Sequence, residues 1–204
     1  MSEKIKLGIS HGDVNGISYE IIIKTLMDDR MLEICTPVIY GSPKVAAYHR
    51  KALDIENFNM NSINLADEAR PGRVNIINCI DDNIRVELGK STPGAGESSY
   101  MALKRSTEDL KANRIAALVT APINKKNIQS KDFNYEGHTE YLKERLGAKD
   151  VMMLMISDLM KIGLVTTHAA IKDLPALITR EMIVNKLALL SDTLLKDFGI
   201  RNPR

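Results

Sequence analysis

Residues 11–18 are the first segment whose residue types could do chemistry, because they lie between a predicted strand and a predicted helix and read His-Gly-Asp-Val-Asn-Gly-Ile-Ser. In α/β proteins such loops lie at the carboxyl edge of the sheet, where ligands bind. Asn15 and Gly16 permit a turn with positive φ, and the start of the following helix offers N–H groups to an anion. The alternative is a structural turn, with Ser18 as the helix N-cap and Asp13 hydrogen-bonded within the turn. The loop residues by themselves favour neither alternative.

Residues 119–125 are a second candidate, because polar residues follow a predicted buried strand in the sequence Val-Thr-Ala-Pro-Ile-Asn-Lys. Polar side chains at the carboxyl end of a strand suit substrate positioning, and Lys125 suits a phosphate or a carboxylate. The alternative is an ordinary loop that begins a short helical stretch at residues 125–130. Composition alone favours this alternative, since polar loops at strand ends are common.

Two of the four histidines lie at predicted element boundaries, where α/β proteins place ligands: His138 opens a helix and His168 ends a strand. They are 30 residues apart (168 − 138), which fits no compact metal motif such as His-Glu-x-x-His. From the residues alone, a structural role is the commoner expectation for both. His49 lies in the charged stretch Tyr-His-Arg-Lys and is predicted to be solvated.

Residues 93–99 contain Gly-x-Gly, but they do not form a dinucleotide-binding fingerprint. Ser99 occupies the position of the third glycine, and no convincing strand directly precedes the segment. That fingerprint requires a strand, a loop and a helix in succession. The segment is instead predicted to be part of a loop at residues 88–96 and the start of a helix.

Strands and helices that could position these segments alternate along the chain. Consecutive apolar residues, as at 116–119, indicate strands that helices cover on both faces. The alternation predicts an α/β fold with a largely parallel sheet, with a lobe junction at residues 122–132. The predicted strands are residues 5–10, 36–40, 73–79, 115–120, 151–156 and 162–167. The predicted helices are residues 19–28, 44–53, 97–112, 139–146 and 182–198.

The last predicted helix has the clearest boundaries. Thr179 is its expected N-cap, Glu181 suits its positive first turn, and Gly199 is its expected stop. An α/β alternation requires a further strand after this helix, so the chain is expected to be incomplete. The helix carries one apolar stripe, formed by Met182, Ile183, Leu187, Leu190, Leu194 and Leu195.

The composition limits the expected partners. The 204 residues carry a net charge of +2 without a concentrated basic cluster, so nucleic acid and anionic membranes are not expected as main partners. No segment has the pattern of a signal peptide or a membrane span. The two cysteines, Cys35 and Cys79, lie in apolar strand-like runs and are predicted to be buried free thiols. Such thiols are typical of the reducing cytoplasm.

In this order, the segments resemble the 4-hydroxythreonine-4-phosphate dehydrogenase family over essentially the whole chain. Its first loop commonly reads Gly-Asp-Pro-Ala-Gly-Ile-Gly-Pro-Glu. This sequence matches that loop at Gly12, Asp13, Gly16, Ile17 and Glu20, and departs from it at Val14, Asn15, Ser18 and Tyr19. The other similar blocks are Thr-Ala-Pro-Ile-x-Lys at residues 120–125, Gly-His-Thr-Glu-aromatic-Leu at 137–142, Met-Met-Leu at 152–154 and Thr-Thr-His at 166–168.

The resemblance implies roles that the local chemistry leaves open. It implies that His138 and Thr139 bind substrate and that His168 is a ligand of a divalent metal (Zn, Mg or Co). It places the other metal histidines, and further substrate-binding residues, beyond the point that corresponds to Arg204. The chain by itself is therefore expected to be inactive. No catalytic base is identified.

The resemblance also implies an architecture like that of isocitrate and isopropylmalate dehydrogenases, with two α/β lobes. Residues 1–124 would form the first lobe. Residues 125–204 would start the second lobe, with metal and substrate residues and a dimer interface. The implied assembly is a homodimer with a shared active site.

The implied reaction is the oxidation, with decarboxylation, of 4-phosphooxy-L-threonine in pyridoxal phosphate biosynthesis. NAD or NADP would be the cofactor, bound without a Rossmann fingerprint, and the metal would stabilise the developing alkoxide. Two alternatives stay open. One is a paralogue that oxidises threonate or erythronate 4-phosphate, because Val14 and Asn15 depart from the family pattern. The other is a non-catalytic binding module.

Overall fold

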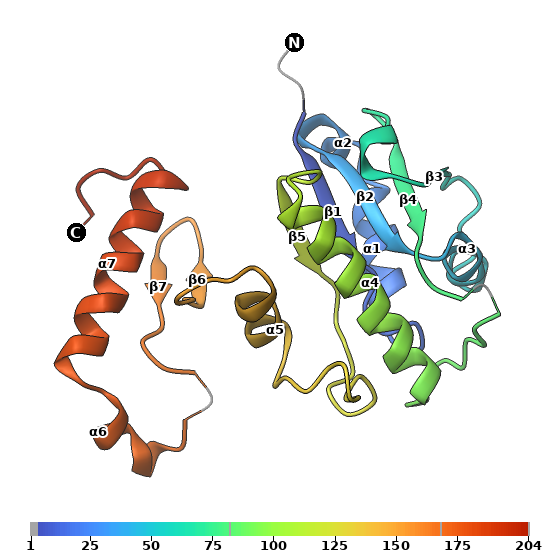
Figure 1. The fold of residues 1–204 in the computed structure, drawn as a ribbon. Helices are drawn as coiled ribbons and strands as arrows, with labels where there is room; N and C mark the ends of the chain where they lie inside the picture. The colour runs from blue at the N-terminus through green and yellow to red at the C-terminus, as the bar shows by residue number, and fades with distance from the viewer. Residues whose placement is uncertain (1–3, 82, 168, 204) are drawn as a thin grey trace. The chain divides into compact units, whose positions relative to one another are not determined.

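Two compact units make up the protein. The computed structural model describes residues 4–81, 83–167 and 169–203. The chain divides into one unit of Met1–Gly147 and another of Ala148–Arg204. In Figure 1 the second unit is the part coloured orange to red, with α6 and α7.

A five-stranded sheet forms the centre of the first unit, with the strand order β3-β4-β2-β1-β5 and every pairing parallel. Gly8 of β1 pairs with Val38 of β2 on one side and with Leu118 of β5 on the other. The all-parallel pairing confirms the predicted α/β class. The strands are β1 (Lys6–Ser10), β2 (Thr36–Gly41), β3 (Met60–Ile63), β4 (Val74–Asn78) and β5 (Ala117–Thr120).

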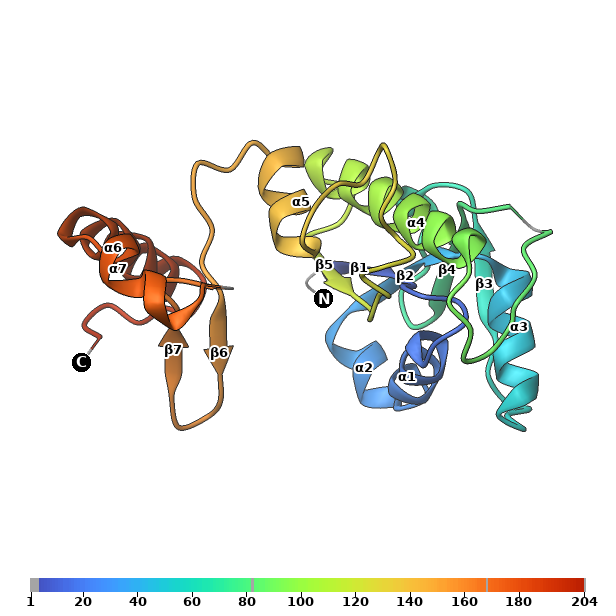
Figure 2. The same ribbon diagram turned by 90° about the horizontal axis from the view of Figure 1, so that it is seen from below.

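Helices cover both faces of this sheet, which is why β2 is buried along its whole length. Figure 2 shows α1 (Ser18–Leu26), α2 (Asp29–Ile34) and α3 (Pro43–Ala52) on one face and α4 (Pro93–Lys111) on the other. The alternation of β2 side chains follows these layers. Ile39 belongs to the core with α1 and α3, whereas Tyr40 belongs to the core with α4.

A third core joins α5 (His138–Arg145) to α4. Phe133 and Tyr141 are fully buried with Leu103 of α4, and their two rings stack with centroids 5.5 Å apart. Because of this packing, residues 125–147 belong to the first compact unit. The compact units therefore divide at a later position than the lobe boundary predicted after residue 124.

The second unit pairs a short hairpin with helices. β6 (Leu154–Ile156) and β7 (Lys161–Gly163) are antiparallel, followed by η2 (Ile171–Asp173), α6 (Leu174–Leu177) and α7 (Arg180–Lys196). The predicted caps of the last helix are confirmed. The Thr179 hydroxyl accepts a hydrogen bond from the Met182 N–H at 3.1 Å, and Gly199 has a φ of 67°.

Several element boundaries differ from those predicted. α4 begins at Pro93 and is capped by the Thr92 hydroxyl. Residues 88–92 therefore form a loop, as predicted, whereas residues 93–96 of the predicted loop are helical. β3, α2 and the short η1 (Ala66–Glu68) were not predicted from the sequence. Residues 125–128 form a turn and not a helix, and β7 ends at Gly163, before the predicted end at residue 167.

The two cysteines are free thiols, as predicted, and they differ in burial. Cys35 and Cys79 are both free; Cys35 is buried and Cys79 is partly buried. Burial raises the pKa of the Cys79 thiol to about 12, so it stays protonated at neutral pH. Among the helices of the described part of the chain, none has the length and apolar character needed to cross a membrane.

Candidate functional site

The loop at residues 11–18 is packed tightly against the end of β5. β1 and β5 are neighbours, while the chain continues from β1 to β2 on the opposite side, so the topological switch point lies here. The Asp13 N–H and the Ser18 hydroxyl both donate to the Pro122 carbonyl, at 2.9 and 2.8 Å. Gly12 has a φ of 70°, and a Cβ there would lie 2.3 Å from the same carbonyl oxygen. The loop is therefore held directly against the segment that follows β5.

The structural alternative for this loop is confirmed for Asp13 and wrong for Ser18. The Asp13 carboxylate accepts the Asn15 N–H at 2.9 Å, as predicted for a turn. Ser18 is not the N-cap, however, because it lies inside α1 and its hydroxyl is used by Pro122. The positive φ predicted near Gly16 occurs at Gly12 instead.

Asn15 connects this loop to the segment before α4. Its side-chain amide donates to the Lys90 carbonyl and to the Thr92 hydroxyl, both at 3.0 Å, and accepts the Glu87 N–H at 2.8 Å. Asn15 is 2% exposed. Its departure from the family pattern thus has a structural reason, and its amide is occupied by protein partners.

Three buried rings stack beneath the loop. The Tyr19 ring lies between His11, at a centroid distance of 5.4 Å, and His49, at 5.1 Å. The prediction that His49 is solvated was wrong: it is 4% exposed and its Nε2 lies 2.7 Å from the Val14 carbonyl. One helical turn separates it from Val45, so both face the core.

His11 is fully buried, and neither of its ring nitrogens has a hydrogen-bond partner in the described structure. Burial lowers its pKa from 6.5 to about 4. The nearby Ser98 backbone opposes this shift, although it does not meet the geometry of a hydrogen bond, and His49 adds to the shift. The ring is therefore neutral in the folded protein at physiological pH, whereas the unfolded chain binds a proton near pH 6.5.

His11 should make the protein sensitive to mild acid. Its contribution to stability is fully present above pH 6.5 and is lost as the pH falls from 6.5 through 4. By linkage, His11 alone should lower the free energy of unfolding by about 2 kcal/mol between pH 7 and pH 5. Urea unfolding at both pH values measures this loss, which should shrink by that amount in His11→Gln. Equal losses in the wild type and the variant would contradict the assignment.

The end of β5 and the start of α5 form the strongest candidate for a ligand site. The Asn124 carboxamide oxygen accepts the N–H groups of Lys126 and Asn127, at 3.0 and 3.3 Å, and so shapes the turn. This is the ordinary loop that composition favoured, but it also directs Lys125 toward Gly137. A Cβ at Gly137 would lie 3.9 Å from the lysine Cε and 4.0 Å from its Nζ.

His138 begins α5, as predicted, and Thr139 follows it in the first turn. The Nε2 atom of His138 is buried and has no hydrogen-bond partner among the described residues. Burial and then the charge of Lys125 lower the pKa of His138. A neutral imidazole and an ammonium are thus close together, with Thr139 next in the chain, which suits a polar, anionic ligand. All three residues were candidates from the sequence, but no sequence pattern indicated that Lys125 lies near the other two.

His168, the predicted metal ligand, lies outside the described residues. Within the described part of the chain, no group of three or more His, Cys, Asp or Glu side chains could hold a metal. The neighbouring Thr166 and Thr167 line a cavity of about 500 Å³ in the second unit. These threonines follow β7 by several residues and do not end the strand as predicted.

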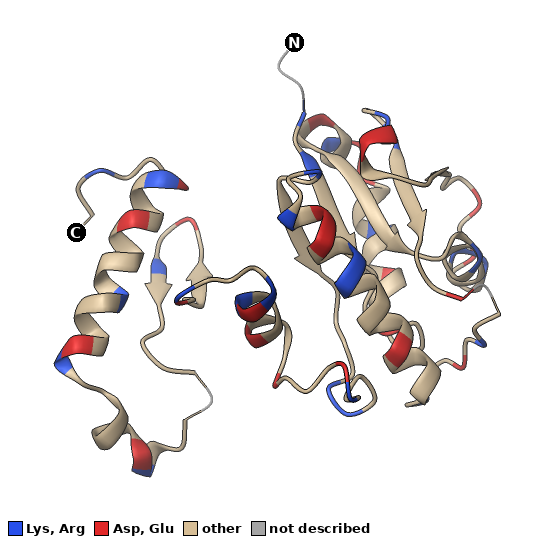
Figure 3. Cartoon of the chain, in the orientation of Figure 1, with Lys and Arg blue, Asp and Glu red and all other residues tan. Residues whose placement is uncertain are grey.

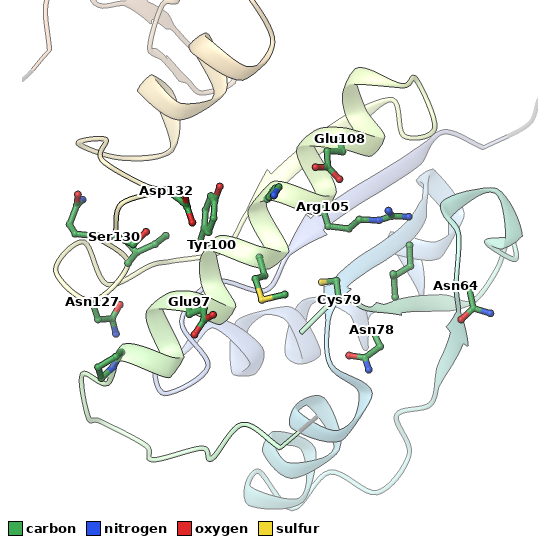
Figure 4. Close-up of a pocket in the computed structure, with 16 residues that line it drawn as sticks. Asn64, Asn78, Cys79, Glu97, Tyr100, Arg105, Glu108, Asn127, Ser130 and Asp132 are labelled. Carbon is green, nitrogen blue, oxygen red and sulfur yellow. The ribbon is translucent and has the colours of Figure 1, made fainter. Parts of the chain in front are cut away.

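A wider cavity, of about 890 Å³, lies along α4 and beside the end of β4 (Figure 4). Its lining includes the basic Lys104 and Arg105 and the acidic Glu97, Glu108 and Asp132. The opposing charges give it no clear preference for an anion. Lys125, His138 and Thr139 do not line this cavity. We therefore treat the cavity as separate from the candidate site at the start of α5.

Comparison with known proteins gives one consistent family. The family model described as "Pyridoxal phosphate biosynthetic protein PdxA" matches residues 33–204. The 4-hydroxythreonine-4-phosphate dehydrogenase of Bacteroides thetaiotaomicron is 49% identical over 98% of this chain and 55% of its own length. A relative from Oceanobacillus iheyensis, named as a D-threonate 4-phosphate dehydrogenase, is 31% identical over 100% of this chain and 62% of its own length.

Solved structures agree with these relatives. A 4-hydroxythreonine-4-phosphate dehydrogenase from Burkholderia phymatum matches with a TM-score of 0.85 and 28% identity, over 100% of this chain and 62% of that chain. The chain thus spans little more than half the length of the proteins it matches. The family match covers most of the chain, and the matched motifs include those at residues 120–125 and 137–142. The chain therefore belongs to the PdxA family of pyridoxal phosphate biosynthetic proteins.

Proposed function

We propose that the protein takes part in the NAD(P)-dependent oxidation, with decarboxylation, of 4-phosphooxy-L-threonine in pyridoxal phosphate biosynthesis. The observation that carries the proposal is the approach of Lys125 to the start of α5, where His138 and Thr139 lie. The 49% identity with a 4-hydroxythreonine-4-phosphate dehydrogenase supports the same substrate. Because the chain spans 55% of that relative, we propose the activity for the protein as a whole.

The described residues would bind and orient the substrate. His138 is neutral at physiological pH, so its imidazole can make a hydrogen bond to a substrate hydroxyl or acid group without adding charge. The Thr139 hydroxyl both donates and accepts. These two side chains would hold the secondary alcohol in one orientation, which is the contribution that positioning makes to catalysis.

The cofactor and the metal belong to the same proposal. NAD or NADP would accept the hydride, and its binding would not use residues 93–99, which form the first turns of α4. His168 would be a ligand of a divalent metal (Zn, Mg or Co). The described residues do not form a metal site of their own, so we assign no step of theirs to the ion.

A second substrate is favoured by a specific relative. The 31% identity with a protein named as a D-threonate 4-phosphate dehydrogenase supports a paralogue that oxidises threonate or erythronate 4-phosphate. Asn15 does not distinguish the two substrates, because its amide is occupied by Lys90, Thr92 and Glu87. The higher identity with the first relative makes 4-phosphooxy-L-threonine the first substrate to test.

We also propose a cytoplasmic homodimer with a shared active site. The exposed apolar side chains of the second unit support an interface there, since burying each would contribute roughly 1.5–3 kcal/mol. The largest exposed fractions are 98% at Leu159 and 85% at Ile171. Nucleic acid and membranes are not proposed as partners.

A substrate panel tests the function. The purified protein, supplied with a divalent metal and either NAD or NADP, is incubated with 4-phosphooxy-L-threonine, threonate 4-phosphate or erythronate 4-phosphate, and cofactor reduction is followed. The highest kcat/KM should be obtained with 4-phosphooxy-L-threonine. A preference for either other compound would support the paralogue. If none of the three compounds led to cofactor reduction, the proposed dehydrogenase activity would be refuted and a non-catalytic binding module would be favoured.

A further inference from the structure

Lys125 is an exposed cation without an ion-pair partner. It lies in the turn after β5, where the ribbon is blue for lysine in Figure 3. Among the residues that the structure describes, no carboxylate lies within 4.0 Å of its Nζ. Its side chain nevertheless reaches back to the backbone of Gly137, 12 residues later (137 − 125). Among the described residues, the ammonium therefore has a defined position beside Gly137 and no ion-pair partner.

Other donors without partners lie around the same point. Gly137 is the N-cap of α5 and has no side chain to cap the helix, so the N–H groups of the first turn have no side-chain acceptor. The His138 imidazole adds a buried Nε2 that lacks a partner. Three independent groups, an ammonium, a ring nitrogen and a free helix turn, therefore converge.

One acidic group faces this convergence. The Glu140 carboxylate lies 3.6 Å from the position that a Cβ at Gly137 would occupy, so it would repel an anion bound there. Lys125 lies at a similar distance from the same position and carries the opposite charge. An anion at this position would be repelled by the glutamate and attracted by the lysine, so loss of the lysine should weaken its binding.

We propose that Lys125 is a further substrate-binding residue of the site that contains His138 and Thr139, and that its ammonium binds the phosphate group of the substrate. The assignment of this site to a phosphorylated substrate rests on the proposed function. A phosphate monoester has three terminal oxygens and up to two negative charges. One oxygen can therefore meet the ammonium while the others meet the N–H groups of the first turn of α5, whereas a carboxylate has only two oxygens.

The neighbouring Lys126 provides a matched control. It has the same charge and lies in the same exposed turn, but only its backbone N–H is used, in the bond to Asn124. Replacing either lysine with methionine removes one charge and keeps an unbranched side chain that is shorter by one atom. The two variants therefore separate a specific contact from a general loss of positive charge.

Binding can be measured without turnover. Orthophosphate is titrated into the protein while the His138 imidazole is followed by NMR, in the wild type, Lys125→Met, Lys125→Arg and Lys126→Met. Phosphate should shift the resonance and raise the pKa of His138, because a bound anion favours the charged ring. Lys125→Met should weaken this binding about tenfold or more, as expected for the loss of a charge-assisted bond. Lys125→Arg should retain most of it, and Lys126→Met should behave as the wild type.

Acetate and steady-state kinetics complete the test. If acetate shifts His138 as strongly as orthophosphate, the phosphate assignment is overturned. With the preferred phosphorylated substrate, Lys125→Met should raise KM by about tenfold or more and change kcat less. An active protein whose KM and phosphate binding are unaffected by Lys125→Met would overturn this inference and leave the proposed function intact. Lys125-dependent phosphate binding without turnover of any substrate would retain the site and refute the proposed function.

Discussion

Replacing Gly96 with alanine should unfold or severely destabilise the first unit. A Cβ at Gly96 would lie 1.8 Å from the Asn127 carbonyl oxygen, 2.3 Å from its carbon and 2.8 Å from the Ile128 nitrogen. All three are backbone atoms, so no side chain can rotate away, and α4 must separate from the turn that carries Lys125. We expect a loss of more than about 3 kcal/mol in the free energy of unfolding.

Gly94 provides the control within the same helix. It also lies in the first turn of α4, but a Cβ there would meet no atom within 4 Å. Gly94→Ala should therefore stabilise the protein by about 0.5–1 kcal/mol, because alanine loses less backbone entropy in a helix. Soluble yield and urea unfolding compare the two variants. A Gly96→Ala protein as stable as Gly94→Ala would show that α4 does not approach the turn this closely.

Replacing His168 with alanine should remove the metal and the activity while the protein stays folded. The prediction rests on the proposed role of His168 in the Thr-Thr-His block. Losing a direct ligand should reduce metal affinity by much more than the roughly 10–100-fold that is typical when a residue behind a ligand is changed. Metal content of the purified variant is the direct measurement, with circular dichroism to confirm the fold.

His138→Ala is the comparison for this experiment. Its substitution should raise KM or lower kcat with the metal still bound, because a hydrogen bond to substrate need not involve the ion. Unchanged metal content in His168→Ala would refute the ligand assignment. If the metal were lost from His138→Ala instead, the two histidines would have to exchange roles.

The sequence by itself determined most of the long elements and their order, because the signals for them are local. Runs of apolar residues indicated four of the five strands of the parallel sheet, missing only β3. The caps of α7, at Thr179 and Gly199, were also correct, since a cap acts on N–H and C=O groups within a few residues. The start of α5 at His138 follows from the same kind of signal.

The sequence could not determine which distant residues meet. His49 lies in a charged stretch, yet the packing of α3 against α1 buries it beside Tyr19. Asn15 departs from the family pattern, and only the structure shows that its amide is bonded to the segment 75 residues later that includes Lys90. In both cases the environment of the side chain is set by other elements, and no local pattern encodes it.

The candidate site depends on both kinds of information. Residue types and family blocks identified Lys125, His138 and Thr139 separately, because their chemistry and motifs are visible along the chain. Their convergence was decided by tertiary packing: Phe133 and Tyr141 hold α5 against α4, and this brings the start of α5 back to the end of β5. The physical reason is the hydrophobic effect. α5 docks where its apolar rings are removed from water, and that place depends on residues far away in the sequence. The polar groups of the site are then positioned by that docking.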